Sequence, residues 1–255
     1  MKKISSRWLP IFIAMVLVGL SQSVGAQKYA VILIGPGTPY AINNNGIVVG
    51  AYRTDSAHYC DRIHGFSWQN GQITDLKAFA GWSRAYAVNS AGLIVGYSET
   101  VACSPNNVHA FSWIDHVMND LGTLGGSGSS ANDVNDSGVI VGEATLPDGR
   151  HHSVIWLPGD RIMAIGALSG VSTIANAINN KNVVVGISCE SGGTDFHPFL
   201  WDNWQYSELG TLDGRFGWPT DINDLGQVVG YSHASGTTTD HAVMWHNGIM
   251  VDLGG

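Results

Sequence analysis

Residues 41–50 read AINNNGIVVG, and residues 87–96 repeat this stretch as AVNSAGLIVG. The pattern recurs three more times, so that its asparagine falls at positions 43, 89, 135, 179 and 223. The spacing between successive copies is 46, 46, 44 and 44 residues. A nearly constant period of this length indicates a chain built from repeated structural units.

Two further blocks follow each copy of the motif. The first runs from a histidine to a tryptophan, as in His109-Ala110-Phe111-Ser112-Trp113. The second places an acidic residue before leucine, as in Asp120-Leu121, and only the third unit departs from it, with Ala164-Ile165. Together the blocks divide the chain into five units, at approximately 37–80, 81–126, 127–170, 171–214 and 215–255.

Each unit is expected to form four β-strands. The Asn-x-x-Gly step suits a type I turn that ends on a glycine in the left-handed conformation. In the fourth unit Asn182 replaces this glycine, and asparagine is the residue that best tolerates the same conformation. The apolar run that follows has no polar alternation, which favours a strand covered on both faces. Asn70-Gly71 and Asn247-Gly248 predict a two-residue hairpin between the third and fourth strands.

Antiparallel four-stranded units at this period are typical of β-propeller blades. We therefore predict an all-β fold, a β-propeller of about five four-stranded antiparallel blades in a single domain over residues 27–255. A β-solenoid and an elongated array of hairpins are the alternatives. Residues 29–34 precede the first unit and resemble an additional fourth strand. Either this strand pairs at the closing blade, or the five units are part of a larger ring.

Residues 1–26 have the layout of a secretory signal peptide. Basic residues precede the apolar run of residues 9–20, and small residues lead to a cleavage site between Ala26 and Gln27. As a helix, the apolar run would reach only about 18 Å, short of the ~30 Å hydrocarbon core, which argues against a membrane anchor. We expect a secreted, periplasmic or extracellular protein with no membrane span after cleavage.

Composition and charge exclude several classes. Hydrophobic residues make up 44% of the chain and charged residues 13%, which argues against disorder. The predicted cleavage removes three basic residues and leaves nine against twenty acidic ones, a net charge of −11. Such a surface repels nucleic acid, so we expect no nucleic-acid partner.

The motifs His-Ala-Phe-x-Trp, Asn-x-x-Gly-x-Val-Val-Gly and Asp-Leu-Gly-Thr-Leu-Gly-Gly, taken together, resemble the bacterial extracellular HAF-repeat family. His109-Ala110-Phe111 is the literal tripeptide, and the resemblance covers residues 29–255. It implies an exported bacterial protein with propeller-like repeats and brings no catalytic residues to carry over. Ser153-Val154 and Pro198-Phe199 depart from the Ala-Phe step, which predicts less regular packing in those units.

Residues that recur in every unit are interpreted as structural. A histidine next to the same strand start in each unit is expected to make a hydrogen bond rather than to bind metal, so we predict no metal and no cofactor. The tryptophans are expected to pack between blades. These residues are His64, His109, His152, His197, His241, Trp68, Trp113, Trp156, Trp201 and Trp245.

The three cysteines are Cys60, Cys103 and Cys189, an odd number without a Cys-x-x-Cys pair. Cys60 and Cys103 occupy corresponding loops of successive repeats, so a Cys60–Cys103 disulfide is a candidate. The alternative is three free or buried thiols.

Positions that break the repeat are the candidates for ligand binding. In a four-stranded meander, the loop between strands two and three and the loop between units open on the same face. Aromatic rings beside arginine or aspartate suit a carbohydrate or a peptide. The alternative is that these rings fill the gap between neighbouring blades. The candidates are Arg53, His58, Tyr59, Asp61, Trp82, Arg84, Arg215, Phe216 and Trp218.

Motifs of common catalytic sites are missing from the sequence. It contains no Gly-x-Ser-x-Gly elbow, no His-Glu-x-x-His helix and no phosphate loop. We therefore predict an exported, non-catalytic binding or interaction module with a carbohydrate or protein ligand. A glycan hydrolase with unrecognised carboxylates and a purely structural surface protein are the alternatives. Asp133 and Asp221 share a repeat position and are interpreted as turn residues rather than as a catalytic pair.

Overall fold

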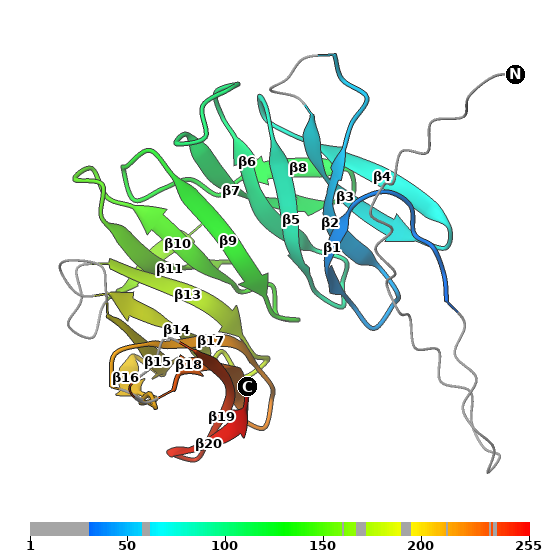
Figure 1. The fold of residues 1–255 in the computed structure, drawn as a ribbon. Helices are drawn as coiled ribbons and strands as arrows, with labels where there is room; N and C mark the ends of the chain where they lie inside the picture. Colours follow the sequence, from blue (N-terminus) through cyan, green and yellow to red (C-terminus); the bar gives the residue numbers. More distant parts are fainter. Residues whose placement is uncertain are drawn as a thin grey trace, which may run out of the picture.

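The computed structural model describes residues 31–57, 62–159, 161–166, 172–189, 195–212, 214–234, 236 and 239–255. Within these residues the chain forms five four-stranded antiparallel sheets and no helix (Figure 1). Each sheet pairs its strands in chain order and lies within one predicted repeat unit, so we number the sheets as blades 1 to 5.

The strands of blade 1 are β1 (Thr38–Ile42), β2 (Val48–Arg53), β3 (Ile63–Gln69) and β4 (Gln72–Lys77). Blade 2 holds β5 (Ser83–Val88), β6 (Ile94–Glu99), β7 (Val108–Ile114) and β8 (Val117–Asp120). Blade 3 holds β9 (Ser129–Val134), β10 (Ile140–Thr145), β11 (His151–Leu157) and β12 (Arg161–Gly166). Blade 4 holds β13 (Ser172–Ile178), β14 (Val184–Cys189), β15 (Phe196–Asp202) and β16 (Gln205–Glu208). Blade 5 holds β17 (Gly217–Ile222), β18 (Val228–His233), β19 (Asp240–His246) and β20 (Ile249–Gly254).

The repeated asparagine closes the first hairpin of every blade. In blade 2, Asn89 Oδ1 accepts hydrogen bonds from the amides of Ala91 and Leu93, at 3.0 Å each. The turn ends on Gly92 at φ +84°, and Asn182 holds the same place in blade 4 at φ +63°. The predicted exchange of glycine for asparagine at this left-handed position is therefore confirmed.

The glycine that follows each apolar run lies opposite a bulge in the first strand. A Cβ at Gly96 would collide with the carbonyl oxygen of Arg84, and one at Gly142 with that of Ser130. The strand pairing is irregular at the same points. These glycines therefore permit a close backbone approach that a side chain would block.

Hydrophobic clusters lie between the blades. One joins Val95 and Ala110 of blade 2 to Ile140, Val154 and Trp156 of blade 3. In blades 1 to 4 the valines of the second strands are covered on both faces, as the unbroken apolar runs predicted, whereas Val229 of blade 5 is exposed. The core is thus a series of blade-to-blade layers rather than one central cluster.

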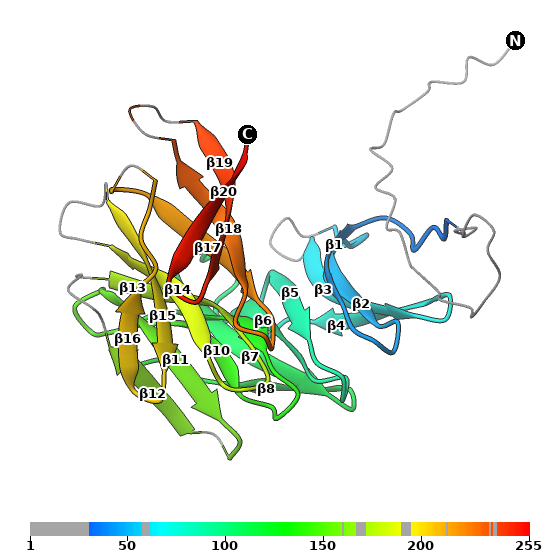
Figure 2. The ribbon, with the colours of Figure 1, turned by 90° about the horizontal axis from the view of Figure 1, so that it is seen from below.

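The five blades follow one another around an arc, with blade 1 and blade 5 at its ends (Figures 1 and 2). The first strands of neighbouring blades, from β1 to β17, lie next to each other along the inner side. Residues 31–35, the described part of the predicted extra strand over 29–34 and its following glycine, form no strand. Within this segment Ile34 is buried and packs on Val48, Phe66 and Trp68 of blade 1. A side chain anchored on the face of a sheet, without strand pairing, accounts for the difference.

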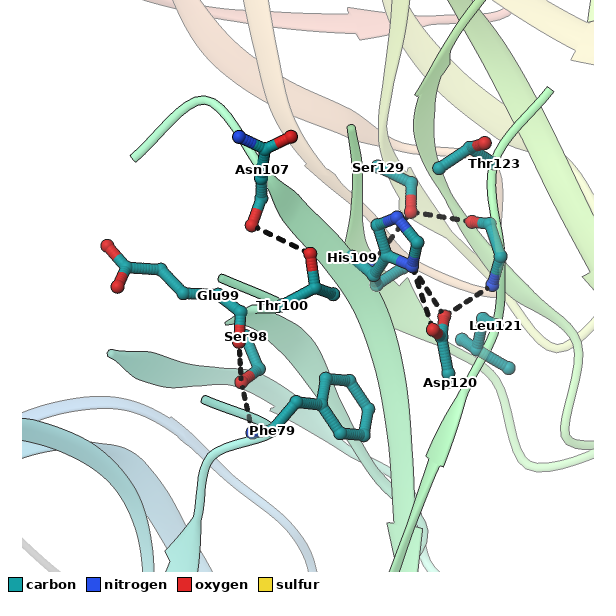
Figure 3. A network of polar contacts seen from close by, with 12 residues as sticks. Phe79, Ser98, Glu99, Thr100, Asn107, His109, Asp120, Leu121, Thr123 and Ser129 are labelled. Atoms are coloured by element: carbon teal, nitrogen blue, oxygen red, sulfur yellow. Dashed lines mark hydrogen bonds and ion pairs between the residues drawn. The ribbon is translucent and has the colours of Figure 1, made fainter. Parts of the chain in front are cut away.

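In blades 1, 2, 4 and 5 the repeated histidine bonds to the acidic residue of the fourth strand, whereas Ala164 gives His152 of blade 3 no such partner. Figure 3 shows His109 facing Asp120, at 2.8 Å between Nδ1 and Oδ2, while Asp120 Oδ1 accepts the amide of Gly122. Blade 3 has Ala164 at the acidic position, and there the neighbouring His151 pairs with Glu143 instead. The pairs thus join the third strand to the fourth in blades 1, 2, 4 and 5, and to the second strand in blade 3. The other pairs are His64–Asp75, His197–Glu208 and His241–Asp252.

Candidate functional site

A cavity of about 580 Å³ lies on the inner side of the arc. We call it the central cavity. Its lining comes from four blades, mostly from their first and second strands, and lies nearer the start of the first strands than the Asn-x-x-Gly hairpins. This is the end of each blade that carries the variable loops. The lining residues are Tyr86, Tyr97, Val108, Ser130, Asn132, Glu143, Ile174, Asn176 and Trp218.

Tyr86 and Tyr97 form one wall of the cavity, and Tyr40 and Arg84 lie behind Tyr86. Tyr86 lies edge-on to Tyr40 at 5.4 Å between ring centroids and 5.6 Å from Tyr97. Arg84 Nη1 donates to Tyr40 Oη at 2.7 Å. Burial and the neighbouring Tyr97 raise the pKa of Tyr86, so its hydroxyl stays protonated at neutral pH.

Trp218 forms another wall of the cavity, and an aromatic cluster packs against its ring. The Trp218 ring is nearly parallel to that of Tyr231, at 6.4 Å, and Phe196 lies 5.8 Å from Trp218. Phe216 stacks on His233 at 4.1 Å. These contacts hold the Trp218 ring in one orientation at the edge of the cavity.

Polar groups lie between the two walls. Asn132 Nδ2 donates to the carbonyl of Ala175 at 2.9 Å, and Asn176 Nδ2 donates to that of Pro219 at 2.7 Å. Both amides are therefore fixed by the next blade, which orients their side-chain carbonyl oxygens. Asn132 Oδ1 also accepts the hydroxyl of Ser130 at 3.1 Å and keeps a second lone pair for a further donor.

Glu143 adds a carboxylate to the lining of the central cavity. His151 Nδ1 lies 2.7 Å from Glu143 Oε2, and this hydrogen bond raises the pKa of His151. The central cavity therefore combines aromatic surface with fixed hydrogen-bonding groups.

Few of the residues predicted for the ligand site line this cavity. Trp218 does, from β17 rather than from the loop before it. Arg84 and Phe216 lie behind the lining, on Tyr40 and on the Trp218 cluster. Trp82 is half-buried in the loop before β5, where its amide donates to Glu99 Oε2, and Arg53 and Arg215 are exposed. His58, Tyr59 and Asp61 lie outside the described residues.

Most lining residues were not among the sequence candidates, because those candidates came from the loops that break the repeat and the lining comes from strands. Tyr86, Asn132 and Asn176 hold equivalent places three residues before the motif asparagine. Tyr97 and Glu143 both follow the glycine of the second strand. The sequence does carry a signal for them: these strand positions differ in residue type from one repeat to the next, although small buried residues flank them.

A second pocket, of about 370 Å³, lies at the hairpin end of the inner strands. Asp133 reaches it from β9 and is half-buried. Its Oδ2 accepts the amide of Ile178 in blade 4, and its Oδ1 accepts the amide of Val134, both at 2.8 Å. Asp133 is therefore a link between blades, and its interpretation as a turn residue was wrong because a repeat position alone does not show where a side chain points.

Burial raises the pKa of Asp133 to about 7, although its two amide partners favour the charged form. A folded-state pKa above the unfolded value means that the folded chain takes up a proton between about pH 4 and pH 7. We therefore expect the free energy of unfolding to fall as the pH rises through this range. Chemical denaturation at pH 4.5, 6 and 8 measures it. Asp133→Asn, though less stable throughout, should lose this slope, and an unchanged slope would contradict the assignment.

Two further features are the state of the cysteines and the membrane-spanning potential of the chain. Cys103 is disulfide-bonded and Cys189 carries a thiol, whereas Cys60, the predicted partner of Cys103, lies outside the described residues, as do residues 1–26. In the described part of the chain, no helix is long and apolar enough to cross a bilayer.

Comparison with known proteins concerns the fold. No protein-family model and no curated protein matches this chain. Among solved structures it resembles TolB from Acinetobacter baumannii, with a TM-score of 0.59 and 14% identity over 82% of this chain and 53% of TolB. Pyrococcus horikoshii acylaminoacyl peptidase matches with a TM-score of 0.59 and 13% identity over 90% of this chain and 40% of the peptidase. A Mycobacterium tuberculosis puromycin-hydrolyzing peptidase matches with a TM-score of 0.56 and 14% identity over 84% of this chain and 37% of that protein.

These similarities support a conclusion about the fold of this chain and not about its activity. The chain spans about half or less of the length of each of these proteins, and identities of 13–14% carry the fold and not the activity. The predicted fold class is confirmed: the chain is an all-β protein whose five four-stranded antiparallel sheets are the blades of a β-propeller.

Proposed function

We propose that this chain is an exported binding module that holds a carbohydrate in the central cavity. One observation carries the proposal: the rings of Tyr97 and Trp218 line the same cavity as the oriented side chains of Asn132, Asn176 and Glu143. Sugar rings present apolar faces and a rim of hydroxyl groups. Aromatic surface matches the faces, and fixed acceptors match the rim.

The fixed polar groups favour a carbohydrate over an apolar ligand. The carbonyl oxygens of Asn132 and Asn176 and the carboxylate of Glu143 are all acceptors, and hydroxyl groups can donate to each of them. An apolar ligand would bury these groups without offering them a donor. Asn132 and Glu143 would keep only Ser130 and His151 as partners, and each acceptor left unsatisfied would cost about 1–3 kcal/mol.

Binding without catalysis agrees with the chemistry of the lining. Glycosidases of the common mechanism need two carboxyl groups across the scissile bond. Among the described residues that line the central cavity, Glu143 is the carboxylate, and it is paired with His151. Export of the module rests on the signal-peptide pattern of residues 1–26.

A glycan array that includes peptidoglycan fragments, followed by calorimetry on each hit, tests the proposal. We expect Trp218→Ala to weaken binding about 5- to 30-fold, because loss of one stacking face costs about 1–2 kcal/mol. Tyr97→Ala should act in the same direction. Trp204→Ala is the matched control, since this tryptophan is exposed in the turn between β15 and β16, away from the cavity.

Two outcomes would reject the carbohydrate assignment. The first is an absence of binding to every glycan on the array. The second is binding that Trp218→Ala and Tyr97→Ala leave unchanged while Trp204→Ala weakens it. Release of reducing ends from a bound glycan, abolished by Glu143→Gln, would instead identify a hydrolase.

A further inference from the structure

The four joins between consecutive blades show what a blade face requires. In each join, the valine before the second-strand glycine of the earlier blade packs against the following blade and is completely buried. These residues are Val49, Val95, Val141 and Val185. The equivalent residue of blade 5, Val229, is 43% exposed. Blade 5 therefore presents an uncovered face of the kind that every other blade buries.

Blade 1 presents the complementary face. The apolar residue before the motif asparagine is buried in blades 3 to 5, where Val134, Ile178 and Ile222 are 5–6% exposed, and Val88 of blade 2 is partly buried. Its equivalent in blade 1, Ile42, is 51% exposed. The two ends of the arc thus carry the two halves of the join that is repeated within it.

A ladder of hydrogen bonds runs through the hairpins and stops at the same two ends. The side-chain amide of each motif asparagine donates to the carbonyl of the next one, from Asn43 to Asn89 at 2.8 Å and onward to Asn223. At the end of the arc, Asn223 Nδ2 turns back to Gln227 Oε1 in its own hairpin. Blade 5 therefore holds a donor that elsewhere reaches the next blade.

A second row of hydrogen bonds also runs from each blade to the next one along the chain. The amide of Asp136 donates to Asn180 Oδ1, and the amide of Asn180 donates to Asp224 Oδ1, at 2.9 and 2.8 Å. The residue of blade 1 in this row is Asn44, which carries the acceptor that the amide of Asp224 would need. Residues 43–45 are uncharged asparagines, so they pose no repulsion to Asp221 and Asp224.

We propose that copies of this chain associate head to tail, with blade 5 of one copy packed on blade 1 of the next. Val229 and Ile42 then become buried as their equivalents are within the chain. The ladder continues from Asn223 to the carbonyl of Asn43 and from the amide of Asp224 to Asn44. Because the two faces differ, the contact is heterologous, and copies form a closed ring or a longer array.

In the proposed contact, the incoming copy displaces the segment that precedes blade 1. Ile34 covers Val48, Phe66 and Trp68, and it precedes Gly35 at φ +103°. Leu253 holds the equivalent place in blade 5, exposed and followed by Gly254 at φ +89°. In the associated form Leu253 takes the place of Ile34, as Leu76 of blade 1 already does on Ile94 and Phe111 of blade 2.

Sedimentation velocity over a concentration series tests the association. We expect the unsubstituted chain to form dimers or larger species as its concentration rises. Val229→Arg and Ile42→Arg should each weaken association at least ten-fold, because each places a charge in one half of the contact. Val117→Arg, at a similarly exposed site on β8, is the matched control and should associate like the unsubstituted chain.

A mixture of the two arginine variants distinguishes head-to-tail association from contacts between like faces. Each variant keeps one intact face, so an equimolar mixture of Val229→Arg and Ile42→Arg should form a 1:1 dimer that neither forms alone. A mixture that stays monomeric would rule out the head-to-tail contact. A chain that is monomeric at every concentration would also overturn the proposal, and would show an arc that does not pair with another copy. Circular dichroism and thermal melting confirm that the variants are folded.

Discussion

Replacement of Trp156 by alanine is expected to lower the free energy of unfolding by about 4 kcal/mol. Trp156 is 1% exposed and lies in the cluster between blades 2 and 3. Its Nε1 donates to the carbonyl of Leu121, at 2.8 Å. The substitution opens a cavity between two sheets whose backbones are held by their own pairing, and it removes the donor of a bond between blades. Denaturant unfolding followed by tryptophan fluorescence measures the loss.

Trp204→Ala is the matched control for this experiment. Trp204 is 64% exposed in the turn between β15 and β16, so its removal should change stability by less than about 0.5 kcal/mol. Similar losses for the two variants would mean that Trp156 does not contribute to the interface as its burial indicates. A loss confined to Trp156→Ala would support packing of this residue between blades.

Asn135→Ala is expected to cost about 3 kcal/mol, because one buried side chain serves two blades. Its Oδ1 accepts the amides of Ser137 and Val139, at 3.1 and 3.0 Å. Its Nδ2 donates to the carbonyl of Asn179 and to Asn182 Oδ1, at 3.1 and 2.8 Å. Alanine leaves these buried groups without partners. Chemical denaturation provides the measurement.

The same substitution at the end of the ladder isolates the part between blades. Asn223 caps its own hairpin in the same way, but it is exposed and its amide bonds to Gln227. Asn223→Ala should therefore cost only about 1 kcal/mol. Asn135→Asp keeps the acceptors and loses the donors, so it should fall between the two. Equal losses at the two positions would show that the ladder between blades adds nothing to stability.

The repeat units could be predicted because each depends on contacts close in sequence. The turn at Asn89 and Gly92 is closed by groups within four residues, and the exchange of glycine for Asn182 follows from backbone conformation alone. Even the strand pairing follows, since a short hairpin sets the register of its two strands. The blades were therefore predictable one at a time.

The candidate site could not be predicted in this way. Tyr97, Glu143 and Trp218 are far apart in the chain and meet only because blades 2, 3 and 5 place their inner strands around one cavity. Trp218 was selected from the sequence as a loop residue, yet it lines the cavity from a strand. The depth at which a side chain lies in the cavity depends on how the blades stack.

The amino-acid pattern alone therefore accounts for the period, the blade and the residues that build each hairpin, because these depend on short-range sterics and hydrogen bonds. The tertiary structure decided which varying positions face the central cavity, where Asp133 bonds, and that Val229 and Ile42 lie uncovered at the ends of the arc. These features depend on the angle between successive blades. That angle results from packing summed over all the joins, and no single repeat encodes it.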